Sequence, residues 1–178
     1  YIANEDVRKK YLSNGDYQYY DSDAHKFDGN VFLKAAYHIS DQWDVFADLQ
    51  YRHVGYKTDG INDKFYEEES GYYNQKLDIN EKYDFLNPKA GFSWSLGGHR
   101  IYGSAALSHR EPERNNFTDN GSYPFPKAEQ LMDYELGYTF DSGIIRLGAN
   151  FFYMDYTDQF VQTCEVSDIG ENLTTNIK

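Results

Sequence analysis

The sequence has little of what several protein classes depend on. Its single cysteine, Cys164, cannot build a disulfide framework within the chain. No apolar run approaches the ~18 residues of a membrane-spanning helix, and the mean hydropathy is -0.80. Basic residues are scarce too, since 17 Lys and Arg face 29 Asp and Glu, for a net charge of -12. Binding to phosphate backbones requires clustered Lys and Arg, so we expect no nucleic-acid partner.

Further absences limit the chemistry. The histidines show no metal-ligand spacing, and we expect no metal site and no cofactor; they are His25, His38, His53, His99 and His109. The acidic stretch 59–69 lacks the ligand positions of a calcium loop. The chain starts at Tyr1, not Met, and shows no signal peptide. We expect this of an exported chain after cleavage or of a piece of a longer protein.

Aromatic residues, in contrast, are abundant. The chain contains 18 Tyr and 12 Phe, and aromatic residues make up 18% of it. Tyr and Phe favour strands, and Tyr suits positions with one apolar and one wet side. The composition therefore predicts an all-β fold. Low hydropathy does not exclude a membrane barrel, because barrel strands are apolar only at every second residue.

Apolar and polar residues alternate in six runs. In the fifth, Met132, Tyr134 and Leu136 alternate with Asp133 and Glu135, which is the period of a strand. The six runs are 27–39, 43–56, 86–96, 100–110, 131–140 and 145–157. Short turns at 40–42, 97–99 and 141–143 join them in pairs. The pattern predicts three hairpins.

Longer connections separate the hairpins. We expect loops at 57–85 and 111–130, a loop with at most a short strand at 1–25, and loop-like chain after 157 until a new strand opens at Leu173. All short turns then lie at one end of a meander and all long loops at the other. Outer-membrane barrels show this asymmetry, with strands of ~9–11 membrane-crossing residues. The fold class we predict is all-β, an antiparallel up-and-down meander that is part of a large transmembrane β-barrel.

The distribution of charge supports a membrane setting. None of the six apolar rows carries a charged residue through its central portion, although charged residues make up 26% of the chain. A Lys or Arg facing lipid at the midplane costs ~2–4 kcal/mol, whereas a watery lumen tolerates it. Trp43 and Trp94 lie beside short turns, and Tyr51 and Tyr153 lie towards the long loops, as membrane-interface belts require. A water-exposed sheet with one buried face gives the same alternation, so both readings stay open at this point.

Several segments, in order, resemble the barrel of bacterial TonB-dependent outer-membrane receptors. They are DFLNPKAGFSWSL, SHREPERNNFTD, PKAEQLMDYELGYTF, GANFFYMDYTDQFVQT and DIGENLTTNIK. The resemblance implies a barrel of about 22 strands with a plug inside, located in the bacterial outer membrane and driven by the TonB system. This chain would be a single fragment, residues 1–178, with six or seven strands and no plug.

The function implied is TonB-energised import of a scarce ligand, with an iron chelate of siderophore or haem type as the ligand class. The expected partners are outer-membrane lipid, the TonB system through the absent plug, and a small-molecule ligand. The chain would not be an enzyme, and a polar lumen explains carboxylates such as Asp133 and Glu135 without catalysis. The alternatives are a soluble ligand-binding β-barrel or sandwich and a β-rich carbohydrate-active enzyme. Solubility without detergent would distinguish them.

The candidate ligand-binding residues lie in the expected long loops. Aromatic and amide side chains there combine rigid contact area with adaptable hydrogen bonding; they are Tyr66, Tyr72, Tyr73, Asn115, Asn116, Tyr123 and Phe125. Arg110 and Arg114 lie where a strand opens into a loop, around Pro112, which ends the ladder. We expect both to face a ligand or to pair with lumen carboxylates such as Glu135.

Overall fold

The structure is a computed structural model of the chain. It describes residues 20–68, 71–118, 120, 124–166 and 172–177, together with residues 5 and 9; within the strands it covers the side chains of all but 64–68 and 71–73. No helix in these ranges is long and apolar enough to span a membrane.

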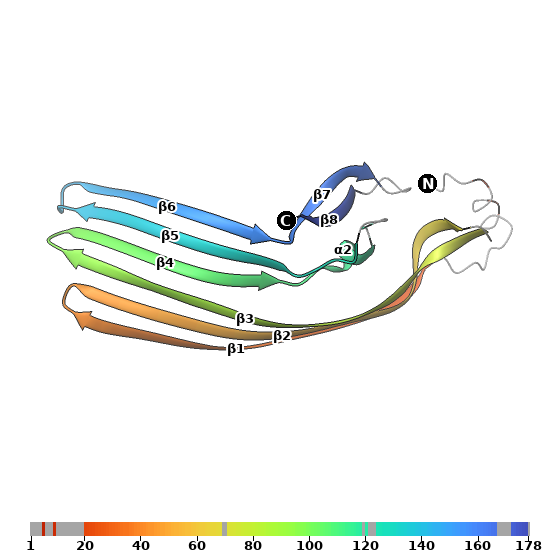
Figure 1. Ribbon diagram of the computed structural model, residues 1–178, viewed down its shortest axis with the longest axis horizontal. Coiled ribbons are helices and arrows are strands. Elements are labelled where there is room, and N and C mark those ends of the chain that lie inside the picture. Colours follow the sequence, from red (N-terminus) through yellow and green to blue (C-terminus); the bar gives the residue numbers. More distant parts are fainter. Residues whose placement is uncertain are drawn as a thin grey trace.

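Six antiparallel strands form one meander in the order β1-β2-β3-β4-β5-β6 (Figure 1). Their bounds are Asp21–Ser40, Trp43–Glu68, Gly71–Leu96, His99–Arg110, Glu129–Asp141 and Arg146–Thr157. A short helix, α2 (Arg114–Thr118), lies between β4 and β5. β7 (Gln159–Val166) and β8 (Asn172–Ile177) form a separate two-stranded sheet. The predicted all-β meander is confirmed, with β1 and β6 at the two edges of an open sheet.

The strand register places the six apolar rows on one face. Directly paired residues on antiparallel strands share a face, and one row across the sheet consists of Tyr37, Val45, Phe92, Gly103, Leu136 and Phe151. We call this the outer face and the opposite one the inner face. The inner face carries Lys34, Asp48, Lys89 and Asp133 in a single row. The predicted separation of apolar and charged rows is therefore confirmed.

Three tight turns lie together at one end of the meander (Figure 1). At the β3–β4 turn, Gly97 and Gly98 have φ of 57° and 85°, a region that favours glycine. A Cβ on Gly98 would lie 2.4 Å from the backbone oxygen of Asp141 in the next turn. Glycine therefore lets adjacent turns approach closely, and the predicted short turns are confirmed.

The predicted loop at 57–85 is wrong. β2 and β3 are each 26 residues long and stay paired up to Glu68 and Gly71, far beyond the ~9–11 residues that cross a membrane. The expected loop at 1–25 also gives way to β1 at its end, where Asp21 pairs with Ile61. We call the paired chain beyond Tyr51 in β2 and Leu86 in β3 the hairpin extension.

The two faces exchange character in the hairpin extension. Its outer face is polar, with His53, Lys57 and Asp59 on β2 opposite Asp84, Asn80 and Asp78 on β3. Its inner face holds most of the buried apolar residues in the described part of the chain, namely Val54, Leu77, Ile79 and Phe85. The core thus lies at the long-loop end, inside the extension. Below it the outer face is exposed, with Leu33 at 72% and Phe151 at 71%.

The region after β6 also differs from expectation. The stretch predicted as loop-like contains β7, and the strand predicted from Leu173 is β8, which pairs with β7. Asp158, with φ of 52°, lies where the chain leaves β6. Such a backbone turn is uncommon for a residue other than glycine, and here it separates the two sheets.

Candidate functional site

The sheet divides at the long-loop end. β3 and β4 pair only as far as Lys89 and Ala106, whereas β4 and β5 stay paired up to Arg110 and Glu129. Between β4 and β5 the structure describes residues 111–118, 120 and 124–128, and α2 in this stretch lies beside the extension (Figure 1). We call this stretch the inner segment, because it contacts inner-face residues of β1 and β2.

The inner segment packs its α2 helix on the hairpin extension. The ring of Phe117 stacks on Tyr56 with centroids 6.0 Å apart, and Phe125 lies 5.2 Å from Phe117. The amide of Gln75 donates to the backbone oxygen of Thr118 at 3.3 Å. Burial on this face also raises the pKa of Tyr83 to about 12. The inner segment therefore adds Phe117 to the buried apolar residues of the hairpin extension.

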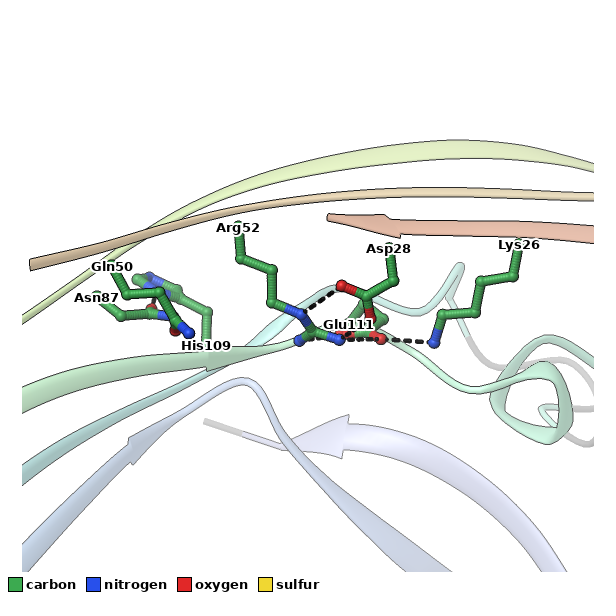
Figure 2. Close-up of polar contacts among 7 residues, drawn as sticks. All are labelled: Lys26, Asp28, Gln50, Arg52, Asn87, His109 and Glu111. Carbon is green, nitrogen blue, oxygen red and sulfur yellow. Dashed lines mark hydrogen bonds and ion pairs between the residues drawn. The ribbon is translucent and has the colours of Figure 1, made fainter. Parts of the chain in front are cut away.

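A cluster of four charged residues fixes the start of the inner segment (Figure 2). The Glu111 carboxylate accepts hydrogen bonds from Lys26 Nζ at 2.8 Å and from Arg52 Nη1 and Nη2 at 2.8 and 3.0 Å. The other edge of Arg52 donates to Asp28, with Nε at 3.0 Å and Nη2 at 2.6 Å. Paired contacts of this kind combine geometric specificity with strength. We call these four residues the Glu111 cluster.

The Glu111 cluster is electrically balanced and partly closed to water. Two cations and two carboxylates sum to zero charge, and the side chain of Glu111 is only 9% exposed. Burial opposes ionisation of Glu111, but hydrogen bonds from Lys26 and Arg52 outweigh it and lower its pKa. Glu111 is therefore ionised at neutral pH, and removal of Arg52 would leave a carboxylate with one partner fewer.

A second polar network lies beside this cluster at the fork between β3 and β4 (Figure 2). Asn87 Nδ2 donates to Gln50 Oε1 at 3.0 Å, which leaves Asn87 Oδ1 to accept from His109 Nδ1 at 2.8 Å. The His109 ring also stacks on Phe85 at 5.2 Å. The network joins β2, β3 and β4 where the backbone ladder between β3 and β4 has ended.

The β7–β8 sheet contacts the far end of the inner segment. Glu129 accepts from the Phe160 backbone N–H at 2.9 Å and from Arg110 at 3.2 Å. Asn176 donates to the backbone oxygen of Lys127 at 3.1 Å and accepts from the Lys127 backbone N–H at 2.8 Å. The inner segment is thus held by β1–β3 on one side and by β7–β8 on the other.

The predicted arginines have partners within the chain. Arg110 pairs with Glu129, so the suggested partner Glu135 is wrong. The physical reason is register, because Arg110 lies opposite Glu129 whereas Glu135 lies opposite Ser104. Arg114 donates to the Ser22 hydroxyl at 3.1 Å. Each guanidinium thus has a partner within the chain, although the side chain of Arg110 remains 54% exposed.

The other predicted residues are only partly brought together. Asn115 is exposed and Phe125 is 57% exposed. Asn116 accepts from the Glu113 backbone N–H at 2.7 Å and donates to Thr174 at 3.4 Å, so it holds the turn. Tyr66, Tyr72, Tyr73 and Tyr123 lie outside the residues whose side chains the structure describes.

The sequence-based reasoning missed Lys26, Asp28 and Arg52. The alternation of the strands already places all three on the polar face. They are not among the candidates because the candidate residues lie in the expected long loops and at their edges. Within the described ranges, no three His, Cys, Asp or Glu side chains gather as a metal site would require.

Comparison with known proteins gives a consistent result. The family described as TonB dependent receptor-like, beta-barrel matches residues 3–177. No curated protein matches. Among solved structures, the copper transporter OprC superposes with a TM-score of 0.71 and 11% identity, over 87% of this chain and 25% of OprC.

Two further structures are similar. The FrpB iron transporter from Neisseria meningitidis gives a TM-score of 0.60 and 16% identity over 96% of this chain and 24% of its own. The ferric-catecholate import receptor Fiu from E. coli K12 gives a TM-score of 0.58 and 16% identity, over 86% of this chain and 24% of Fiu. At these identities the likeness concerns the fold alone. The chain spans about a quarter of the length of each structure.

Proposed function

The chain belongs to the TonB-dependent receptor β-barrel family, and on that premise we propose that it forms part of the wall of a receptor that imports a scarce ligand. Members of the family reside in the outer membrane of Gram-negative bacteria and are not enzymes, in agreement with the localisation and the absence of catalysis expected from the sequence. The proposal adds that import draws energy from the TonB system through a plug elsewhere in the protein.

The outer face is the observation that carries this proposal. Its aligned apolar rows are exposed and free of charge through their centres, as hydrocarbon requires. An open six-stranded sheet would leave backbone groups unpaired at β1 and β6, which lipid does not tolerate. We therefore propose that further strands of the same receptor pair with both edges, so that this chain is one fragment of a larger barrel.

We propose an iron chelate, of siderophore or haem type, as the ligand class. Two of the similar structures are described as iron or ferric-catecholate importers, whereas the third is a copper transporter. A metal-bearing ligand is common to all three. The proposed ligand-facing residues are those of the long-loop end, Asn115 and Phe125 together with Tyr66, Tyr72, Tyr73, Asn116 and Tyr123. Arg110 and Arg114 would join them through the N–H groups that do not contact Glu129 and Ser22.

The test is uptake by cells that carry the full-length receptor. Deletion and complemented strains would be given radio-iron as a catecholate chelate, as a hydroxamate chelate or as haem, and separately radioactive copper as the free ion. We expect saturable, receptor-dependent uptake of one iron chelate that disappears when TonB is inactivated. Uptake of copper alone would overturn the iron assignment. Receptor-dependent uptake of none of the probes would count against the whole proposal.

A further inference from the structure

Glu111 occupies a niche built by two other strands. Its donors are Lys26 of β1 and Arg52 of β2, which lie 85 and 59 positions away in the sequence. The carboxylate therefore does not belong to the wall that surrounds it, because it arrives on the inner segment. An intramolecular group held in this way can be replaced by another group of the same chemistry.

The niche is preorganised for a planar anion. Asp28 binds the Nε edge of Arg52 through two hydrogen bonds and so fixes the plane of the guanidinium. The second edge of Arg52 then faces Glu111, with Lys26 Nζ beside it (Figure 2). A donor held by its own partner, as Arg52 is by Asp28, loses little freedom when it binds, which favours affinity. The orientation of Arg52 by Asp28 does not depend on Glu111.

The charge balance defines the guest that fits. With Glu111 in place the cluster is neutral, and without it Lys26, Arg52 and Asp28 leave one positive charge. The forked guanidinium matches a carboxylate bidentately. A single carboxylate restores both the charge and the hydrogen bonds, whereas a neutral ligand restores neither.

We propose that Lys26 and Arg52 form a carboxylate-binding subsite at the mouth of the receptor, occupied by Glu111 until a carboxylate-bearing ligand displaces it. The inference rests on the proposed function, since it gives the imported ligand a carboxylate group. Displacement frees residue 111 from the wall, so binding loosens the start of the inner segment while Gln75 and the Phe117 contacts still hold α2. Glu111 thus acts as an internal competitor that weakens apparent affinity.

The experiment uses the purified full-length receptor in detergent and measures citrate binding by calorimetry. Trimethyl citrate serves as the uncharged match and inorganic phosphate as a tetrahedral anion. The variants are Glu111→Gln, Arg52→Gln and the double variant, with Arg146→Gln as control. Arg146 also forms two contacts with an aspartate, Asp141, but at the short-turn end. Heat-modifiable gel mobility verifies that each variant is folded.

We expect Glu111→Gln to bind citrate at least about tenfold more tightly than the wild type, since the competitor is gone. Arg52→Gln should abolish that gain in the double variant, and Arg146→Gln should behave as wild type. The affinity for trimethyl citrate should be the same in the wild type and in every variant. Equal or weaker citrate binding by folded Glu111→Gln would overturn the proposal, and so would phosphate binding as tight as that of citrate.

A second measurement needs no variant. Hydrogen exchange of the backbone amides of Glu111 and Glu113 in the wild-type receptor should become faster when citrate is added and should not change with trimethyl citrate. Unchanged exchange at a citrate concentration that saturates the receptor would overturn the displacement. Failure of these binding tests in a receptor that imports an iron chelate in cells would leave the proposed function intact. If the binding tests succeed in a receptor that takes up none of the probes, the carboxylate subsite would be supported and the proposed import function would be rejected.

Discussion

At the scale of single residues, position within the strand period decides where each charge lies. Lys26, Asp28 and Arg52 have the parity of the polar rows and face inward, whereas Tyr51 and His53 on either side of Arg52 face outward. This parity could be read from the sequence. The partner Glu111 could not, because 59 positions separate it from Arg52 and only the divergence of β3 and β4 brings the inner segment to the wall.

Arg52 and Arg146 provide a matched pair for testing burial. Arg52→Gln leaves Glu111 and Asp28 with fewer partners at a site where Glu111 is 9% exposed. Loss of one partner of a buried pair costs roughly 3–5 kcal/mol, and the 24% exposure of Arg52 reduces this to about 2 kcal/mol. Arg146→Gln, at 81% exposure, should cost at most about 1 kcal/mol. Hydrogen exchange of 111–118 measures the first effect, and equal effects of the two variants would contradict it.

The pKa of Glu111 predicts how the inner segment responds to acid. Because this pKa is lowered in the folded protein, ionised Glu111 stabilises the fold above its unfolded pKa, and that contribution is lost as the pH falls through the folded value. Arg52 stays charged throughout this range because Asp28 and Glu111 raise its pKa, and the pKa of Asp28 is also lowered, by Arg52. Protection of 111–118, corrected for intrinsic exchange, should hold from neutral pH to about pH 5 and fall below about pH 4. A loss of protection already between neutral pH and pH 5 would show that another group controls the segment.

At the scale of elements, one continuous alternation in β2 and β3 presents an apolar outer face along one part of the strands and a polar outer face along the other. Below Tyr51 and Leu86 the outer face is apolar, and beyond them it is polar while Val54, Leu77, Ile79 and Phe85 become buried inside. The prediction of a loop at 57–85 failed for this reason. The stretch is polar in composition, and its few apolar residues lie on the inner face, separated along the chain by Lys, Asp and Asn. The alternation of the strand continues through the extension, but the apolar residues move from the outer face to the inner face. In the sequence, this change resembles the end of the strand.

The adjacent residues Leu136 and Glu135 test the assignment of faces in β5. Leu136 lies in an outer row between Gly103 and Phe151, and Glu135 lies inside, between Ser104 and Phe152. Leu136→Arg should cost ~2–4 kcal/mol because it places a charge in hydrocarbon, whereas Glu135→Arg should be tolerated. The yield of heat-modifiable receptor in isolated outer membranes measures the difference. Equal yields from the two variants would exclude the assignment of the outer face to lipid.

At the scale of the whole molecule, the two ends of the sheet differ in structure. Three tight turns close one end (Figure 1), and their identity was predictable because Gly and Asp leave few choices of turn. The other end gathers the hairpin extension, the inner segment and the β7–β8 sheet through contacts such as Gln75 to Thr118 and Asn176 to Lys127. These contacts could not be predicted, since each joins regions that carry no pattern of their own.

This asymmetry predicts that ligand recognition depends on one end only. In the full-length receptor, residues 119–125 would be replaced by two glycines, which removes Phe125 but keeps Glu111 and α2. Binding and uptake of the iron chelate identified in cells should fall at least about tenfold, because rigid aromatic contacts supply much of the affinity of such surfaces. Shortening the turn at 40–42 in the same receptor is the control. It should leave ligand affinity unchanged in the fraction of receptor that is inserted in the outer membrane. Unchanged affinity and uptake after the 119–125 replacement would place recognition in other loops or the plug, and Tyr123 and Phe125 would then no longer be site candidates.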